Sequence, residues 1–142
     1  TTLFRSASIT WKFCWHFIGP EDVPMNDEDT QFVKKCIGVL NTLGHFNCEF
    51  TGREEVLKET TLSLENFFDI ACWYADQAIM NEVLEAYRES INACKENEEG
   101  FDIGLKIIYE SIQKLIEKMN ESYLGWEDEQ NTLNELKSIC KK

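Results

Sequence analysis

The residues most able to carry chemistry in this sequence are its cysteines. There are six of them: Cys14, Cys36, Cys48, Cys72, Cys94 and Cys140. None belongs to a C-x-x-C pair, and structural zinc sites usually need ligands that lie closer together in the sequence. An even set of this kind is typical of a disulfide framework, which forms in oxidising compartments. We therefore expect a secreted, extracellular protein stapled by disulfides, with the pairing left open because six cysteines permit fifteen connectivities.

Catalytic chemistry is not indicated by the other residues. The only histidines are His16 and His45, and His16 lies between aromatic residues, where a packed side chain is a better interpretation than a general base. The sequence has no nucleophile elbow, phosphate-binding glycine loop or zinc-protease motif. Acidic clusters at 27–29 and 96–99 lack the ligand spacing of a calcium loop and suit solvated helix ends. We predict a protein that is not an enzyme and holds no metal and no cofactor.

Aromatic residues are the better candidates for function, because they make up 12% of the chain and dominate both cores and binding hot spots. Too many are present to fill one small core comfortably. The first interpretation is a core rich in aromatics, and the second is a pocket or a partner-facing patch. The candidates for such a surface are Trp11, Trp15, Trp73, Tyr74 and Trp126.

The charge of the chain restricts its partners. It carries 14 Lys plus Arg against 26 Asp plus Glu, a formal net charge of -12. We expect no nucleic-acid binding, since that depends on cationic side chains that displace counterions. Proteins, or small apolar or cationic ligands, are the expected partners, although net negative charge also serves solubility. No apolar run has membrane-spanning length, and Asn120, in the sequon Asn120-Glu121-Ser122, is a candidate glycosylation site.

Apolar periodicity predicts an all-α protein, a disulfide-stapled bundle of about five helices in a single domain over 1–142. The first clear helix covers 27–43, with Asn26 as N-cap and Gly44 as C-cap. A capping-box pattern, Thr51 with Glu54, predicts a short helix at 52–60. The last two helices are expected at 101–123 and 126–140.

Two segments leave alternatives open. Residues 64–96 run without Pro or Gly after a start signal at Ser63, and read as one long helix or as two that bend near 77–81. One long helix is preferred, in which Cys72 and Cys94 would stand about 33 Å apart, too far for a disulfide. Residues 1–18 fit either a strand or a helix; helix is preferred, because a lone strand has no partner in a helical chain.

These features favour a secreted, non-enzymatic interaction protein, effector-like or cytokine-like, that binds a host or receptor protein. The alternative is a carrier that holds a small apolar or cationic ligand between its helices. Disulfide mapping of the native protein is the observation that would test compartment and fold together.

The stretch Cys72, Tyr74, Tyr87, Cys94 resembles one cysteine-tyrosine-cysteine module of the bicycle proteins, secreted effectors of gall-forming aphids that are built around two such modules. Cys14 with Cys36 is similar to a second module but departs from the pattern, because it carries Trp15 and Phe32 in place of tyrosine. The resemblance covers fewer than half of the residues. It implies a non-enzymatic protein delivered into host tissue, with no functional residue to transfer.

Overall fold

The computed structural model describes residues 26–47, 53–96, 102–121 and 125–141, apart from the side chains at 39–47, 53 and 56. These residues form five helices and no strand, which confirms the expected all-α class. The helices are α2 (Asp27–Asn47), α3 (Arg53–Tyr74), α4 (Gln77–Glu96), α5 (Asp102–Asn120) and α6 (Glu127–Lys141). The ambiguous segment 1–18 lies outside the described residues.

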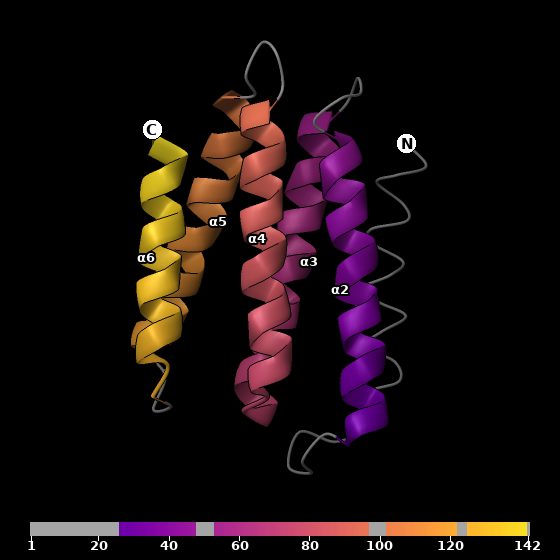
Figure 1. The fold of residues 1–142 in the computed structure, drawn as a ribbon. Helices are drawn as coiled ribbons and strands as arrows, with labels where there is room; N and C mark the ends of the chain where they lie inside the picture. The colour runs from indigo at the N-terminus through magenta and orange to yellow at the C-terminus, as the bar shows by residue number, and fades with distance from the viewer. Residues whose placement is uncertain (1–25, 48–52, 97–101, 122–124, 142) are drawn as a thin grey trace.

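The helices run alternately up and down and lie in two layers (Figure 1). α2, α4 and α6 form one layer and run in the same direction, while α3 and α5 form the other and run in the opposite direction. α4 contacts all four of the other described helices, and α3 contacts α5. The two layers bury their facing sides, which places the outer sides of α3 and α5 together on one face of the bundle.

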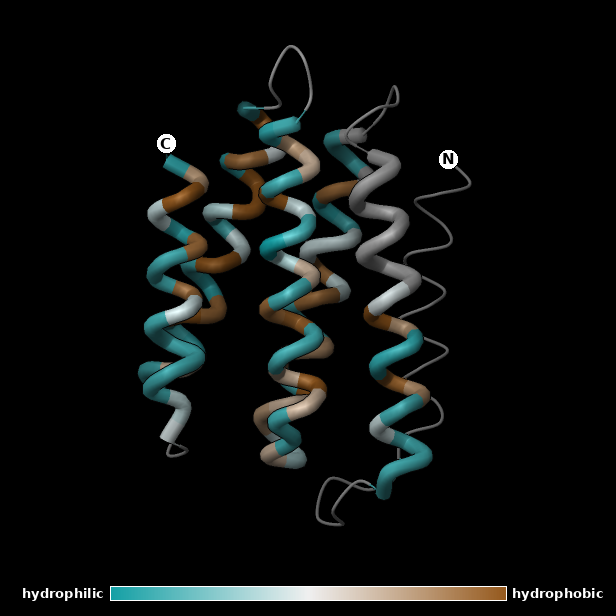
Figure 2. The backbone as a smooth tube through the Cα atoms, in the orientation of Figure 1, coloured by the Kyte–Doolittle hydropathy of each residue, from teal (hydrophilic) through white to brown (hydrophobic). Residues whose placement is uncertain are grey.

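The core lies between these layers. Figure 2 shows hydrophobic positions alternating with hydrophilic ones along α4, α5 and α6, as expected for helices that bury one stripe. The largest fully buried side chains are Tyr87, Phe67, Phe68, Ile37, Leu57, Leu64, Ile70, Ile79, Met80, Ile91 and Ile108. Burying an aliphatic or phenyl side chain of this size typically contributes about 1.5–3 kcal/mol. The helices are therefore held together by the apolar side chains that they bury against one another.

The predicted start of α2 is confirmed, and its predicted end is wrong. The Asp29 amide donates to Oδ1 of Asn26 at 2.8 Å, which makes Asn26 the N-cap. The helix does not end at Gly44 but continues to Asn47. Glycine enters a right-handed helix at a cost of only about 1 kcal/mol, so without a following proline it need not end one.

α3 corrects the predicted short helix at 52–60. The helix is continuous from Arg53 to Tyr74, and no new helix starts at Ser63. The Ser63 hydroxyl donates to the Glu59 carbonyl, one turn back, at 3.0 Å. A serine that bonds back to the preceding turn can lie inside a helix, and its hydroxyl does not then cap the next one.

The preferred single helix over 64–96 is wrong, because the chain turns back at Ala75 and Asp76. Ala75 has a φ of 51°, in the left-handed region. The Asp76 amide donates to the Ala71 carbonyl at 3.0 Å and the Ala75 amide to the Cys72 carbonyl at 3.3 Å, which is a Schellman C-cap built on alanine. Asp76 then caps α4 through a 3.0 Å bond from the Ile79 amide. The alternative of two helices holds, with the break just before the predicted bend.

The predicted disulfide staples are not seen among the described cysteines. Two of these lie in the core, Cys36 and Cys94, and two are half-buried, Cys72 and Cys140; no disulfide joins any two of the four. Cys72 and Cys94 lie at opposite ends of the α3–α4 hairpin, separated by about 25 Å along α4. Cys72 and Cys94 are therefore too far apart for a disulfide in the observed hairpin, as they would have been in a single helix. Cys14 and Cys48 lie outside the described residues.

Candidate functional site

The exposed large hydrophobic side chains that the structure describes belong to α3 and α5. Three large hydrophobic side chains are exposed among the described residues: Leu62 (49%), Trp73 (48%) and Ile103 (53%). Leu62 and Trp73 belong to α3, and Ile103 belongs to α5. Single exposed apolar residues are common on protein surfaces, but a concentration on two neighbouring helices marks a candidate interaction face.

A groove between α3 and α5 holds the candidate site. It contains a half-open cavity of about 300 Å³, to which Leu62 and Ile107 contribute apolar side chains. Its charged lining comprises Lys58, Glu65, Glu110 and Lys114, with Thr61 and Ser111. The groove thus combines apolar surface with a few polar groups, as ligand and hot-spot pockets generally do.

Glu65 is the most unusual residue of this groove, because only 7% of it is exposed. Its Oε2 accepts the Ser111 hydroxyl at 3.1 Å. Ser111 Oγ lies 2.6 Å from the Tyr87 hydroxyl, and since the Ser111 proton is used toward Glu65, Tyr87 is the donor in that bond. Tyr87, Ser111 and Glu65 therefore form a hydrogen-bond chain from the core to the groove, and this chain fixes the orientation of the carboxylate.

Two lysines of α5 pair with acids of α3 beside this chain. Lys114 Nζ lies 3.8 Å from Oε1 of Glu65, and the Lys114 side chain is 63% exposed. Lys118 Nζ lies 3.1 Å from Oδ1 of Asp69. A largely exposed pair such as Lys118 with Asp69 typically contributes only about 0–1 kcal/mol. At 3.8 Å the Lys114 pair lacks a direct hydrogen bond, so it is the weaker of the two and the easier to exchange.

A second cavity, of about 320 Å³, lies between α5 and α6. Its lining includes Leu105, Tyr109, Cys140 and Lys141. The ammonium groups of Lys137 and Lys141 lie 5.4 and 5.1 Å from the centre of the Tyr109 ring. Lys141 lowers the pKa of the Tyr109 hydroxyl, mainly through a hydrogen bond. These are exposed contacts, without the buried polar chain that distinguishes the α3–α5 groove.

Comparison with family models, with characterised proteins and with solved structures found no match. Within the described residues, no group of three or more potential metal ligands comes together. None of the described helices combines the length and the apolar character that crossing a membrane requires.

The half-buried thiols have little nucleophilic character. Burial raises the pKa of Cys72 to about 11, and neighbouring Asp69 acts in the same direction. Burial also raises the pKa of Cys140 to about 11. Because the thiolate is the reactive form, both side chains stay protonated and poorly reactive near neutral pH.

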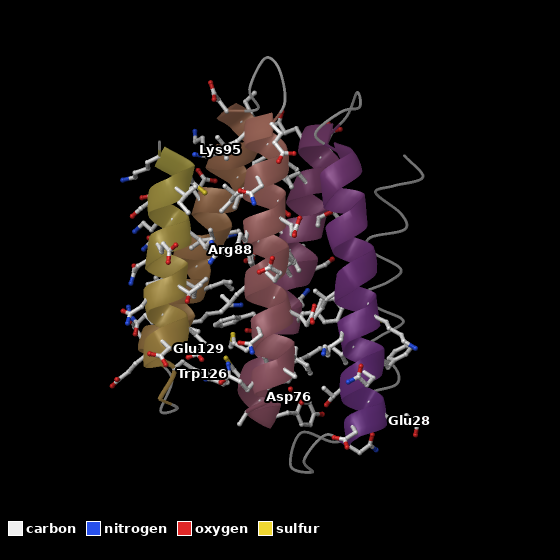
Figure 3. All side chains as sticks on the ribbon, in the orientation of Figure 1. Glu28, Asp76, Arg88, Lys95, Trp126 and Glu129 are labelled. Carbon is white, nitrogen blue, oxygen red and sulfur yellow. The ribbon has the colours of Figure 1, made fainter. Side chains whose placement is uncertain are left out.

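The structure separates the aromatic candidates from one another. Trp73 is exposed on α3, whereas Tyr74 is half-buried against the core. Trp126, at the start of α6 (Figure 3), is only 8% exposed, with no partner for its indole N–H among the described groups. A side chain this deeply packed belongs to the core and offers little area to a partner. Trp11 and Trp15 lie outside the described residues.

Asn120, the candidate glycosylation site, is exposed at the end of α5. Its Oδ1 accepts a hydrogen bond from the Gln130 side chain of α6. The atom that carries the glycan in a modified asparagine is the other amide atom, Nδ2. Ser122, which completes the sequon, lies outside the described residues.

Sequence reasoning missed Glu65 and Ser111. Glu65 stands in a run of the sequence that is rich in apolar residues, among Leu64, Phe67 and Phe68. Ser111 stands between Ile108 and Leu115 on an apolar helix face. A polar residue at a core position is a recognisable signal, because a buried polar group needs a partner. The signal does not identify that partner, which comes from a different helix.

Proposed function

We propose that this protein is a secreted, non-enzymatic interaction protein, effector-like or cytokine-like, that binds a partner protein through the outer face of α3 and α5. One observation carries the proposal: the exposed large hydrophobic side chains that the structure describes, Leu62, Trp73 and Ile103, all belong to these two helices. Aromatic and aliphatic anchors with charged residues around them have the composition of a protein-binding hot spot.

The layered arrangement supports the same face. α4 packs on four helices, and α3 and α5 cover one side of it, so their outer sides face away from the bundle. Docking a partner there needs no rearrangement of the described core. The net charge of -12 favours a basic partner, whose approach it accelerates.

The secreted part of the proposal rests on the cysteines. Their even number favours oxidation, and any bridge that involves Cys14 or Cys48 remains a prediction. The resemblance to the bicycle proteins favours the same class of function, delivery into host tissue. Counting thiols in denatured, unreduced protein recovered from a eukaryotic secretory host tests this part. Because no bridge joins any two of the four described cysteines, oxidation that involves Cys14 and Cys48 leaves two or four titratable thiols per chain. Six thiols per chain would contradict extracellular oxidation.

The binding face is tested by site-specific photocrosslinking. A benzophenone amino acid replaces Leu62 in one variant and Asn131, an exposed residue of α6, in the control variant. Both are applied to intact cells, and crosslinked proteins are identified by mass spectrometry. We expect a partner that crosslinks from position 62 and not from position 131.

The identified partner is then produced in pure form and its affinity measured. Leu62→Ala and Ile103→Ala should each weaken binding by about tenfold or more, as truncation of a hot-spot residue does. Asn131→Ala should leave the affinity unchanged. Equal crosslinking from positions 62 and 131, or unchanged affinity in both α3–α5 variants, would reject this face.

The alternative, a helical carrier of a small apolar or cationic ligand, gives a different result. Native mass spectrometry of the purified protein would then show a stoichiometric small-molecule adduct that disappears on denaturation. Such an adduct would favour the carrier over the interaction protein.

A further inference from the structure

The α3–α5 groove contains a carboxylate that is almost fully removed from solvent. The Glu65 side chain is 9% exposed and belongs to the wall of the cavity. Ser111 donates to Oε2, and Tyr87 in turn donates to Ser111. The carboxylate is therefore held in one orientation before any ligand arrives, and preorganised acceptors of this kind bind more tightly than mobile ones.

The cation that now accompanies Glu65 is poorly placed. Lys114 Nζ is 3.8 Å from Oε1, beyond hydrogen-bond distance, and most of the Lys114 side chain is in solvent. A cation that reached Oε1 directly would form a charge-assisted hydrogen bond, which is the stronger interaction. Lys114 is thus an exchangeable occupant.

The surroundings of Glu65 favour a guanidinium group over an ammonium. A guanidinium is planar, binds a carboxylate through two parallel N–H bonds and is weakly hydrated, so it tolerates contact with apolar side chains. Leu62 and Ile107 supply such apolar surface, and Glu110 supplies a second carboxylate in the same cavity. Lys58 also lines the cavity, but its ammonium group is paired with Glu54 at 3.2 Å. The cavity of about 300 Å³ has room for a guanidinium on a short alkyl stem.

We propose that this cavity is a recognition pocket for an arginine side chain of the partner protein, whose guanidinium binds Glu65 and displaces Lys114. The inference rests on the proposed function, and it adds the chemistry of the partner to it. Arginine is enriched at interface hot spots, and its positive charge complements the net charge of -12.

The probe for this pocket is n-butylguanidinium chloride, which carries the guanidinium and an alkyl stem without a protein partner. Binding is followed on the full chain through the NMR amide shifts of Leu62, Ile107 and Ser111 at low ionic strength. We expect saturable shifts at these three residues. Glu65→Gln keeps the shape and an acceptor for Ser111, and it should weaken binding by about tenfold or more, the usual effect of losing a charged partner.

Lys114→Gln gives the opposite result, because it removes the competing cation. It should tighten binding of n-butylguanidinium several-fold, more than Lys106→Gln, which makes the same charge change on α5 outside this cavity. Glu89→Gln, on an exposed position of α4, controls for the charge change of Glu65→Gln and should leave binding unchanged.

Any one of three results would overturn the proposed arginine pocket. The first is that the natural chain shows no saturable shifts with n-butylguanidinium, the second is that Glu65→Gln binds it as tightly as Glu89→Gln does, and the third is that Lys114→Gln changes its affinity no more than Lys106→Gln does. This outcome is distinguishable from failure of the proposed function. A partner that crosslinks from Leu62 while n-butylguanidinium does not bind would preserve the interaction face and reject the arginine pocket. In the purified complex, Glu65→Gln should also weaken partner binding, and unchanged affinity there would reject arginine as the occupant.

Discussion

At the scale of single residues, Ser111 links the core to the groove. Its hydroxyl accepts a hydrogen bond from the Tyr87 hydroxyl and donates one to the Glu65 carboxylate, so one small side chain satisfies two buried polar groups. Ser111→Ala should lower the free energy of unfolding by about 2–3 kcal/mol, because it leaves a buried hydroxyl and a buried carboxylate unpaired. Urea unfolding followed by circular dichroism measures the change.

Two further measurements separate the contribution of the Tyr87–Ser111–Glu65 hydrogen-bond chain from other effects of the substitution. Ser138→Ala removes an exposed serine that bonds within its own helix, and should change stability by less than about 0.5 kcal/mol. Combining Tyr87→Phe with Ser111→Ala should cost about 1 kcal/mol less than the sum of the single changes, because the two side chains share a bond. Strict additivity would mean that the chain does not act as a unit.

Tyr87 also predicts a dependence of stability on alkaline pH. Burial raises the pKa of its hydroxyl above the ordinary value, so the folded protein keeps the proton after the unfolded chain has released it. The contribution is intact below the unfolded pKa of about 10 and is lost above it, at up to about 1.4 kcal/mol per pH unit. Tyr87→Phe should therefore give a shallower decline in unfolding free energy between about pH 10 and 11. Identical slopes would contradict a buried neutral hydroxyl.

At the scale of elements, the turn between α3 and α4 is built on an alanine where glycine is usual. Ala75 adopts a φ of 51°, which costs an L-residue with a Cβ about 1–2 kcal/mol. The Schellman bonds and the Asp76 cap offset that cost. Asp76 also accepts the Thr30 hydroxyl at 2.8 Å, so the turn is tied to the first turns of α2. Figure 3 shows Asp76 at this end of the bundle.

Ala75→Gly should be neutral or stabilising by up to about 1 kcal/mol. Glycine removes the strain of the left-handed conformation in the folded state, and the greater conformational freedom of the unfolded glycine chain offsets only part of that gain. Ala93→Gly, inside α4, provides the contrast and should destabilise by about 1 kcal/mol or more. Thermal unfolding of both variants gives the comparison. A loss at position 75 as large as that at position 93 would argue against the left-handed conformation.

At the scale of the whole molecule, charge opposes compactness. The chain has twelve more acidic than basic residues, and this excess negative charge causes repulsion in the folded state. The ion pairs between described helices are largely exposed, such as Arg88 with Glu135 at 3.9 Å. Repulsion across the molecule should therefore outweigh the local pairs.

Raising NaCl from about 0.05 to about 0.5 M should then increase the urea midpoint, since the screening length falls from about 14 Å to about 4 Å. KCl at the same ionic strength should have the same effect, because screening does not depend on which monovalent cation is present. A midpoint that falls with salt would show that the ion pairs matter more than the net charge.

The sequence by itself determined the helical class, most apolar faces and the N-cap at Asn26, because these depend on periodicities and on contacts within a few residues. The predicted helix boundaries were wrong where a residue could adopt either of two local conformations or hydrogen bonds. Ser63 bonds backward and does not cap a helix, and Ala75 takes a conformation that alanine seldom adopts.

Only the tertiary structure decided which helices lie side by side and what meets between them. Glu65 and Ser111 are 46 residues apart, and Tyr87 comes from a third helix, so their chain exists only once α3, α4 and α5 pack. The same packing buries Trp126 and leaves Trp73 exposed, although both are tryptophans in helical patterns. Burial depends on which residues are neighbours in space. A local sequence pattern predicts the helix face on which a residue lies, but it does not predict which other helix covers that face.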